Sequence, residues 1–320
     1  MKRILPITVV IPTLNRSKDL MITIQSYVAS SYIPNQIIIV DQSDNIEDRE
    51  NIKNYIQELK EIEILLIELT EKSLTKSRNI GCNYVKNRIV VMSDDDITVQ
   101  DETLLNVYNL MENDEIAMIG GINSNTQIGD SVLGYLLGIK NYFKKDTGYV
   151  TKAILGQFPS GKFNEINTQW AMGFFTVFDN ECRKKWEIIW DEKLWGYAYP
   201  EDLDFSYRFY QEAKKNNKKC VLSDKVTVEH RCSPAARVPK TLSTYMYVVN
   251  REYLSYKFGF GLSSRIQIYW VNLCMFFKRL VQNKKPMDIV KAQLYCWKHH
   301  KEIKTMPLDR QFGEKLKHEN

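Results

Sequence analysis

The chain has 320 residues, of which 44% are apolar and 26% charged, with only 14 glycines and 9 prolines. This composition is that of a globular protein with a sizeable core, and it excludes a disordered, collagen-like or low-complexity chain. The six cysteines form no CxxC pair, so neither a zinc knuckle nor a disulfide framework is indicated, and reduced thiols in a cytoplasmic protein are expected. Pro6 and Pro12 interrupt the apolar N-terminus, which argues against a secretory signal.

The net charge of +5 is unevenly distributed. Residues 251–320 hold 14 Lys and Arg against 6 Asp and Glu, a net charge of +8, whereas residues 1–250 carry a net charge of −3. A basic tail on a slightly acidic body is typical of a segment that meets an anionic partner.

Strands and helices are predicted to alternate over the first third of the chain. The expected strands cover 7–11, 36–40, 63–68 and 88–92, and the expected helices cover 17–30 with Ser17 as its cap, 46–59, 74–86 and 101–111. Such alternation indicates parallel βαβ units, whose strand ends line one crevice, the usual place of a nucleotide. No GxGxxG or GxxxxGK[ST] motif occurs, so the common dinucleotide and P-loop fingerprints are absent.

Three consecutive aspartates follow the predicted strand at 88–92. The apolar positions 89–92 suit a strand buried on both faces, and the run stops at Ser93 and Asp94, Asp95 and Asp96. Three carboxylates at a strand end repel one another unless a cation lies among them, and oxygen ligands suit Mg²⁺ or Mn²⁺. The alternative is an acidic loop or helix N-terminus, where aspartate is common without any metal.

The second half of the chain is less regular. Residues 120–170 are predicted to form an insertion or lid, and a strand follows at 169–178. Pro200 is expected to begin a helix with Glu201 and Asp202 in its first turn, where capping alone would also account for acidic residues. A final short strand at 226–230 ends on His230, for which a satisfied histidine at a strand end is the alternative to a metal ligand.

Three C-terminal helices are predicted, at 240–258, 264–283 and 286–303. The apolar run 266–277 is far shorter than the roughly 20 residues that a membrane span needs. Two interpretations stay open: helices packed on the rest of the protein, or helices lying on an anionic membrane surface, which the +8 charge favours. The residues that bear on this choice are Trp270, Phe276 and Phe277, and the helical face of Met287, Val290, Leu294 and Trp297 with its flanking lysines.

Together, motifs within residues 5–235 resemble family 2 glycosyltransferases of the GT-A fold, which are mostly inverting enzymes that use nucleotide-diphospho-sugars. The segments 9–15 (VVIPTLN), 40–44 (VDQSD) and 77–81 (SRNIG) are similar to the family's first-strand, second-strand and Ala-Arg-Asn-x-Gly motifs. Residues 94–96 resemble its DxD motif, 190–196 (WDEKLWG) its Phe-Asp-Glu segment, and 201–202 its Glu-Asp motif. The resemblance implies an α/β fold: a single mixed, mostly parallel Rossmann-like sheet flanked by helices, with a C-terminal helical extension.

The resemblance also implies roles for individual residues. Asp202 would be the general base and Glu201 would orient the acceptor, while Asp96, Asp94 and His230 would hold Mn²⁺ or Mg²⁺, with Arg231 as a substitute for His230 near the phosphates. Asp41 would contact the base, and Arg78, with Lys76 as a second candidate, would lie near the diphosphate. The full nucleotide site would comprise Pro12, Thr13, Asn15, Asp41, Arg78, Asp94 and Asp95, and the acceptor site Trp170, Gly173, Trp195 and Tyr199.

The predicted division is a catalytic domain at 1–235, with a nucleotide-binding half at 1–119 and an acceptor-binding half at 120–235, followed by a basic helical extension at 236–320. The expected activity is inverting transfer from a UDP- or dTDP-sugar to a hydroxyl of a glycan or lipid-linked glycan in surface polysaccharide biosynthesis. The expected location is cytoplasmic, peripheral on the inner face of the cell membrane, and no nucleic-acid partner is expected.

Two alternatives to glycosyl transfer stay open. A sugar nucleotidyltransferase tends to carry a glycine-rich loop with a basic residue after the first strand, and residues 12–16 lack the glycines. A non-catalytic nucleotide- or glycan-binding member of a polysaccharide assembly complex would have no need of the complete set of Asp94, Asp96, Asp202 and His230.

Overall fold

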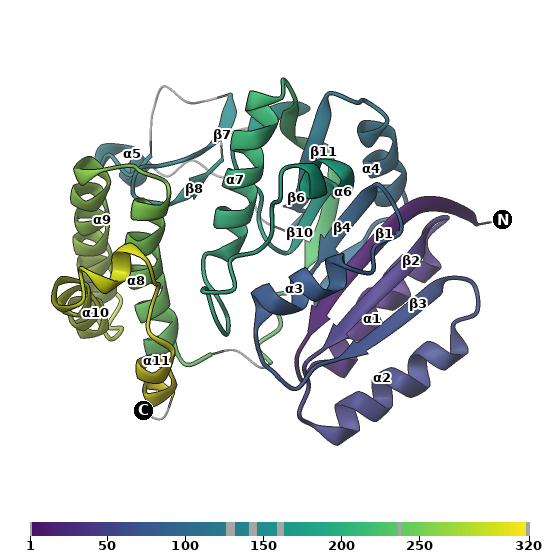
Figure 1. Cartoon of the computed structure of the whole chain (residues 1–320), viewed down its shortest axis with the longest axis horizontal. Coiled ribbons are helices and arrows are strands. Elements are labelled where there is room, and N and C mark those ends of the chain that lie inside the picture. Colours follow the sequence, from purple (N-terminus) through teal and green to yellow (C-terminus); the bar gives the residue numbers. More distant parts are fainter. Residues whose placement is uncertain (1, 126–131, 141–145, 159–162, 236–237, 318–320) are drawn as a thin grey trace.

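The computed structural model describes residues 2–125, 132–140, 146–158, 163–235 and 238–317. Parts of the predicted insertion at 120–170 therefore lie outside the described residues. Figure 1 shows a sheet flanked by helices on one side of the molecule and a group of C-terminal helices on the other, with α7 between them.

The elements have the following bounds. The strands are β1 (Arg3–Thr13), β2 (Tyr32–Asp41), β3 (Glu63–Glu68), β4 (Ile89–Ser93), β5 (Ile97–Val99), β6 (Ile116–Asn123), β7 (Thr147–Val150), β8 (Gly156–Gln157), β9 (Glu165–Thr168), β10 (Phe175–Asp179) and β11 (Lys219–His230). The helices are α1 (Ser17–Ala29), α2 (Ile46–Glu58), α3 (Leu74–Cys82), α4 (Thr103–Met111), α5 (Val132–Leu136), α6 (Asn180–Lys185), α7 (Glu201–Lys215), α8 (Lys240–Lys257), α9 (Leu262–Val281), α10 (Met287–Lys298), the 3₁₀ helix η1 (Glu302–Lys304) and α11 (Arg310–Leu316).

The described strands form a mixed sheet in the order β3-β2-β1-β4-β10-β6-β11-β9-β7-β8, with β5 paired to β11. The four strands β3, β2, β1 and β4 are mutually parallel, and β11 is parallel to β6. β10 is antiparallel to both of its neighbours, β4 and β6. The predicted α/β fold with a mixed central sheet flanked by helices and a C-terminal helical region is confirmed, while parallel pairing predominates only from β3 to β4.

Some local predictions were wrong. Ser17 is not a cap, because α1 begins at Ser17 itself and the Ser17 N–H donates to Asp48 Oδ1 at 2.9 Å. Gly120 and Gly121 belong to β6 and not to an insertion. A Cβ on Gly121 would lie 2.7 Å from Phe175 Cδ1, so close packing against β10 explains this glycine. The strand predicted at 169–178 begins only at Phe175, and the last strand begins earlier than predicted, at Lys219.

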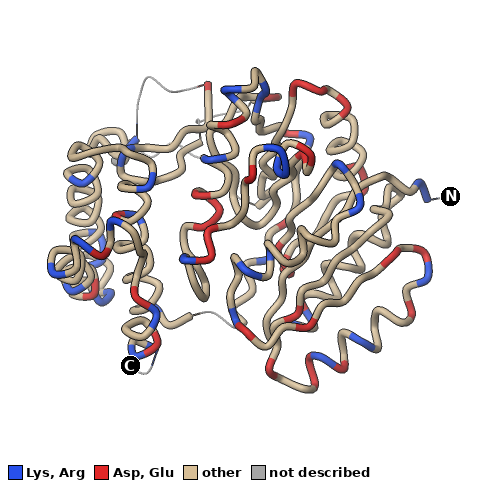
Figure 2. Tube along the Cα trace, in the orientation of Figure 1, with Lys and Arg blue, Asp and Glu red and all other residues tan. Residues whose placement is uncertain are grey.

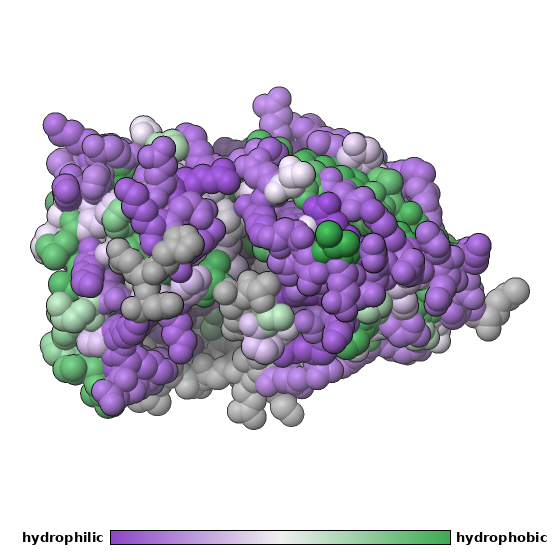
Figure 3. All heavy atoms as spheres, turned by 90° about the horizontal axis from the view of Figure 1, so that it is seen from below, coloured by the Kyte–Doolittle hydropathy of each residue, from purple (hydrophilic) through white to green (hydrophobic). Residues whose placement is uncertain are grey.

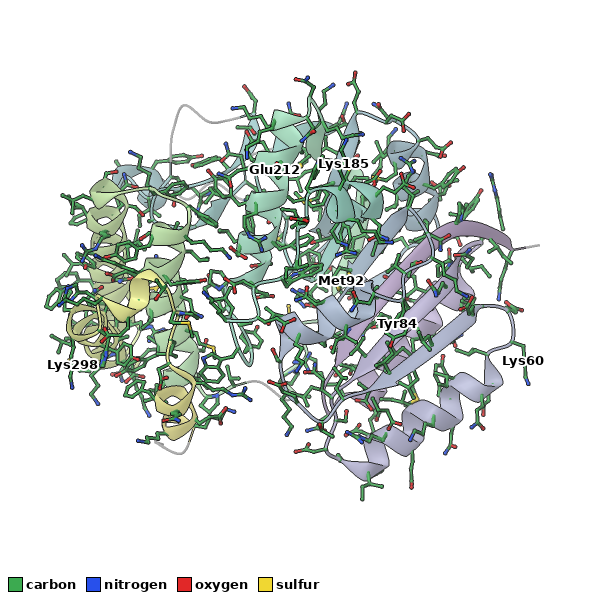
Figure 4. All side chains as sticks on the ribbon, in the orientation of Figure 1. Lys60, Tyr84, Met92, Lys185, Glu212 and Lys298 are labelled. Atoms are coloured by element: carbon green, nitrogen blue, oxygen red, sulfur yellow. The ribbon has the colours of Figure 1, made fainter. Side chains whose placement is uncertain are left out.

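The apolar core divides by its position on the sheet. One cluster lies between the sheet and α1, α2 and α4, and another lies on the opposite face, where Phe205 and Phe209 of α7 pack. Met92 of β4 belongs to the second cluster and lies near the centre of the molecule in Figure 4. Because both faces of the central strands are covered, β4 delivers the residues that follow it to a defined point at the edge of the core.

The C-terminal helices pack on the rest of the protein through a third cluster. It joins Leu194 and Leu203 to Leu242 and Met246 of α8 and to residues of α9, α10 and α11. The apolar face predicted for α10 points the other way: Ile289, Ala292 and Cys296 are buried, whereas Met287, Leu294 and Trp297 are exposed. Lys298, at the end of α10, lies at the outer edge of the molecule in Figure 4.

Among the described residues, no helix is both long enough and apolar enough to cross a membrane.

Candidate active site

The ends of β1 and β2 place the first polar residues of the site. Thr13 and Asp41, the last residues of these parallel strands, are direct partners in the register. The loops that follow are tied together, because the Asn15 N–H donates to Ser43 Oγ at 2.8 Å and Asn15 Oδ1 accepts from the Asp44 N–H at 3.1 Å. The Asn15 side chain is therefore used to join the two loops.

The three aspartates after β4 point in different directions. Asp95 is buried and accepts from Thr13 Oγ1 at 2.8 Å and from Arg16 Nη1 at 2.9 Å, so it fastens the loop after β1. Burial raises the pKa of Asp95 to about 7, although the Arg16 charge opposes the shift. Asp94 remains 30% exposed and accepts from Arg78 Nη2 at 3.2 Å. The placement of Asp95 favours a supporting role beside the nucleotide site.

Asp96 and His230 meet because β5 pairs with the end of β11, with Ile97 opposite His230. His230 Nε2 lies 3.1 Å from Asp96 Oδ1, and Asp96 Oδ2 accepts from the Ser233 N–H at 2.8 Å. Burial tends to raise the pKa of Asp96, but the His230 and Ser233 hydrogen bonds and the Arg16 charge outweigh burial, so the pKa is lowered. Asp96 is therefore held as a carboxylate.

Asp94, Asp96 and His230 form a candidate metal centre. Each offers one ligand atom, and these atoms all lie within 4.8 Å of one another. Two carboxylate oxygens and an imidazole nitrogen suit Mn²⁺, with Mg²⁺ a harder alternative that prefers oxygen alone. The Phe174 ring stacks on His230 at 4.9 Å between centroids and fixes the imidazole plane. The donor set and its spacing fit a divalent cation, and the motif residues predicted for it are brought together.

A second acidic group lies at the start of α7. Arg78 is fully buried, and its Nη1 donates to Glu201 Oε1 at 2.8 Å while its Nη2 donates to Asp94. One guanidinium thus joins the Glu-Asp motif to the DxD motif. Burial raises the pKa of Glu201 to about 7, with the Arg78 charge lowering it and the Asp202 charge raising it.

Asp202 is held by two backbone donors. Its Oδ2 accepts from the Gly173 N–H at 3.0 Å and its Oδ1 accepts from the Leu203 N–H at 2.7 Å. Burial still raises its pKa above the ordinary value of an aspartate, against the effect of these bonds and of Arg78. A Cβ on Gly173 would lie 3.1 Å from Asp202 Cβ, so a larger residue there would press on the Asp202 side chain.

These groups surround a central cavity of about 510 Å³. Its lining includes the site residues Arg78, Asp94, Gly173, Tyr199, Glu201, Asp202 and His230. Sequence reasoning missed Phe158 and Met172, which also line it and carry no motif signal. A carboxylate capable of accepting a proton and a cation site therefore open into the same space, as acid–base chemistry on a metal-bound ligand requires.

A second cavity of about 180 Å³ adjoins the central one, and Asp94 and Tyr197 line both. Pro12, Thr13 and Asp95 line this second cavity. Leu242 and Met246 of α8 and Lys317 form its far wall, so the C-terminal helices complete a crevice that begins at the end of β1. This contribution was not foreseen from the sequence.

The aromatic residues predicted to bind the acceptor lie in different places. Tyr199 lines the central cavity, and the neighbouring Tyr197 does so as well. Trp170 lies behind the lining, where it stacks on Phe158 at 4.4 Å between centroids and donates from Nε1 to the Gln157 carbonyl at 3.1 Å. Trp195 lines the second cavity and donates from Nε1 to the Leu308 carbonyl at 2.7 Å.

Three further predicted residues have other partners. Asp41 is fully buried and lines neither cavity; its Oδ1 accepts from the Ser43 N–H at 2.8 Å, while its Oδ2 has no hydrogen-bond partner among the described atoms. Lys76 pairs with Glu71 at 2.5 Å and does not line the central cavity. Arg231 donates to the Ile97 and Asp19 carbonyls and lines neither cavity, so in this structure its guanidinium braces β5 against α1.

Comparison with known families identifies the stretch that carries the motifs. The model of the family described as glycosyl transferase family 2 matches residues 8–179, more than half of the chain. A comparison with curated proteins gave no match.

Solved structures resemble the fold at low sequence identity. The S. aureus TarS 1–349 structure has a TM-score of 0.52 and 16% identity over 80% of this chain, and the match covers 64% of that 1–349 chain. The mannosyltransferase PcManGT from Pyrobaculum calidifontis, in complex with GDP-Man and Mn²⁺, has a TM-score of 0.55 and 12% identity over 91% of this chain and 74% of its own. GalNAc-T7 with UDP, GalNAc and Mn²⁺ has a TM-score of 0.55 and 17% identity over 92% of this chain and 58% of its own.

Proposed function

The chain belongs to glycosyl transferase family 2, and on that premise we propose that it is an inverting, metal-dependent enzyme that uses a UDP- or dTDP-sugar. The observation that carries the proposal is the shared cavity: Asp94 and His230 of the candidate metal centre line the same space as Asp202. Glycosyl transfer requires stabilisation of the leaving group and deprotonation of the attacking hydroxyl at the same time. The cavity offers a cation site for the first and a carboxylate for the second.

The residues around Asp94 would serve the donor. A divalent cation held by Asp94, Asp96 and His230 would supply Lewis-acid stabilisation to the departing diphosphate. Arg78 presents a fixed charge beside Asp94 and would steady the same phosphates. Thr13, Pro12 and the buried Asp41 lie at the ends of β1 and β2, on the side where the nucleoside is expected.

Asp202 would act as the general base. The raised pKa of Asp202 lies closer to the operating pH than that of an ordinary aspartate, which makes its carboxylate a stronger proton acceptor. The Gly173 and Leu203 N–H groups fix its orientation, and Glu201, held by Arg78, would position the acceptor. Attack from the face opposite the diphosphate inverts the anomeric centre in a single displacement.

The proposed acceptor is a hydroxyl of a glycan or lipid-linked glycan in surface polysaccharide biosynthesis. Tyr197 and Tyr199 offer aromatic faces to a sugar within the central cavity. The +8 charge of residues 251–320 supports peripheral placement on an anionic membrane, at its cytoplasmic face. Figure 2 shows Lys and Arg recurring along the C-terminal helices.

A panel of nucleotide-sugars, each incubated with the protein and Mn²⁺, tests the reaction class. Release of a nucleoside diphosphate is expected, whereas release of pyrophosphate would indicate nucleotidyl transfer and no release at all would indicate a binding protein. The anomeric configuration of the transferred sugar, measured by proton NMR, tests inversion; retention would refute it.

The Asp202→Asn variant tests the base. Turnover should fall by about 10²–10⁴-fold, the usual contribution of a positioned base, while donor binding with Mn²⁺ stays within a few fold of the wild type. Near-normal turnover in this variant would remove Asp202 from the mechanism. The Asp204→Asn variant is the matched control, since Asp204 lies two residues on and pairs with Arg208 and Lys257 outside the cavity.

A further inference from the structure

The outward face of α9 is unusually apolar. The exposed residues of this helix are Leu262, Ile266, Trp270, Leu273, Phe277, Leu280 and Val281, with only Ser263, Gln267 and Lys278 as polar members. Their spacing of three, four and seven residues puts the apolar ones on one side of the helix. The opposite side is the packed one, and it includes the buried polar residues Ser264 and Asn272. Figure 3 shows hydrophobic residues at the surface of this end of the molecule.

Beside this face runs a groove of about 850 Å³, here called the α9 groove. One wall comes from Leu273, Phe277 and Val281 of α9, and the other from Leu137, Ile139 and Leu155. The Trp270 Nε1 donates to the Leu137 carbonyl at 2.7 Å and joins the two walls at one end. A groove of this size and lining suits an extended hydrocarbon chain.

The α9 groove adjoins the central cavity. Lys140 and Gln157 line both of them, so they mark the junction between an apolar space and the space that holds the candidate catalytic groups. A path through this junction passes from apolar walls, past a lysine ammonium, to Asp202 and Tyr199. A sugar linked through phosphate to a lipid has its parts in the matching order: hydrocarbon, phosphate, sugar.

We propose that the α9 groove binds the hydrocarbon chain of a phosphate-bearing lipid acceptor, with the phosphate at Lys140 and the sugar in the central cavity. The proposal rests on the proposed function, because it assumes that an acceptor occupies the central cavity. It assigns to α9 a substrate-binding role beyond attachment to a surface.

Three features favour a lipid over a protein partner or a second copy of the chain. The groove meets the central cavity at Lys140, and a lipid-linked sugar is a ligand whose two ends suit the two adjoining spaces. The rest of the apolar face, including Ile266 and Leu280, is open to a bilayer from which such a lipid would enter. Basic residues accompany it, among them Lys278 and Lys284, and they complement anionic headgroups.

The test measures the binding of farnesyl phosphate, below its aggregation concentration, to the full chain by isothermal calorimetry. Farnesol and inorganic phosphate serve as probes of the two ends of the ligand. Farnesyl phosphate should bind more tightly than farnesol, and inorganic phosphate alone should not bind detectably. Leu273→Asp and Phe277→Asp, each of which puts a charge on a groove wall, should weaken binding by at least about tenfold. Lys140→Gln should reduce the preference for farnesyl phosphate over farnesol.

Ile266→Asp is the matched control, since Ile266 is 61% exposed on the same face but does not line the groove. It should leave farnesyl phosphate affinity unchanged. If Ile266→Asp weakens farnesyl phosphate binding as much as the groove variants do, the lipid adheres to the apolar face in general and the proposal is overturned. Circular dichroism melts of all the variants establish that they fold. If one of the two groove variants does not fold, the other one tests the groove.

Two further outcomes would also overturn it. One is failure of wild-type protein to bind farnesyl phosphate; the other is a concentration-dependent dimer in sedimentation that Phe277→Asp dissociates, which would make the groove a subunit interface. Calorimetry with a nucleotide-sugar and Mn²⁺ on the wild type tests the proposed function separately. Nucleotide binding without farnesyl phosphate binding would overturn only the assignment of the groove. Farnesyl phosphate binding without nucleotide binding would overturn the proposed function, and with it the acceptor role of the groove, while leaving the groove a lipid-binding site.

Discussion

Replacing Arg78 by methionine removes the cation that joins the two acidic motifs in the described part of the chain. Arg78 is fully buried and donates to Glu201 and Asp94, so the variant leaves Glu201 without a counter-charge inside the protein. Loss of one partner of a buried pair costs about 3–5 kcal/mol. Asp94 is 30% exposed and regains water, so the lower end of that range, about 3 kcal/mol, is expected.

The loss should depend on pH in a defined direction. In the wild type, the pKa of Glu201 is raised to about 7, so above that pH the carboxylate is ionised and paired with Arg78. In the variant, Glu201 must stay protonated in the folded protein. The free-energy cost of keeping this proton grows by up to about 1.4 kcal/mol for each unit by which the pH rises. Below about pH 7 both proteins hold the proton when folded, and the difference between them levels off. The loss is therefore larger at pH 9 than at pH 6.

Thermal melts of the wild type and Arg78→Met at pH 6 and pH 9 measure this effect. With an unfolding entropy of about 2.1 cal/mol/K per residue over 320 residues, a loss of about 3 kcal/mol corresponds to a fall in Tm of roughly 4–5 °C. Adding Glu201→Gln to Arg78→Met removes the stranded acid and should restore most of the loss at pH 9. Strictly additive effects of the two substitutions, or an unchanged Tm for Arg78→Met, would refute the assignment of Arg78 as the charge that holds the acidic pair.

Three other predictions follow from the same geometry. Gly81→Ala puts a Cβ 2.5 Å from Val10 Cγ1, so overpacking of about 1–3 kcal/mol should exceed the gain of about 1 kcal/mol in helix propensity, and an unaltered or raised unfolding midpoint in urea would count against that packing. Asp96→Ala should weaken Mn²⁺-dependent nucleotide binding at least about tenfold in calorimetry, and undiminished binding would exclude Asp96 as a ligand. Because burial raises the pKa of Asp202, kcat/KM should fall as pH drops through a value above that of an ordinary aspartate; a profile flat to pH 4 would contradict its role as base.

The parts of the site that follow strand ends could be predicted from the sequence. Asp94 and Asp96 were expected beyond a buried strand, and β4 does end at Ser93 with both faces covered. The Glu-Asp pair was expected at a helix start, and α7 begins at Glu201. These predictions succeed because strand and helix termini are set by local patterns, and because termini of parallel strands gather at one edge of a sheet.

The contact between Asp96 and His230 depends on a strand, β5, that is too short to be predicted from a sequence pattern. β5 has only three residues, and its antiparallel pairing with β11 places His230 in the candidate metal centre. The resemblance to the family suggested His230, while periodicity could not have done so. Likewise, Trp170 and Trp195 looked alike as aromatic candidates, and only tertiary packing separates them from Tyr199.

The apolar positions of α10 show a different limit. Met287, Leu294 and Trp297 recur at helical spacing and were predicted to share one face, which is usually the buried one. The buried residues are instead the small Ala292 and Cys296 with Ile289, because close approach to α8 and α9 favours small side chains. Periodicity identifies an apolar face, but it does not say whether protein or another apolar medium covers it.

The crevice beside Thr13 has a consequence for where the chain can be divided. Its far wall is built from Leu242 and Met246, and Trp195 donates its indole N–H to the Leu308 carbonyl. A polypeptide stopped at the predicted border of residue 235 would keep every motif yet lose that wall, and Trp195 and Leu203 would face water. The recognisable motifs thus end before the residues that complete the crevice, and the C-terminal helices belong to the candidate site.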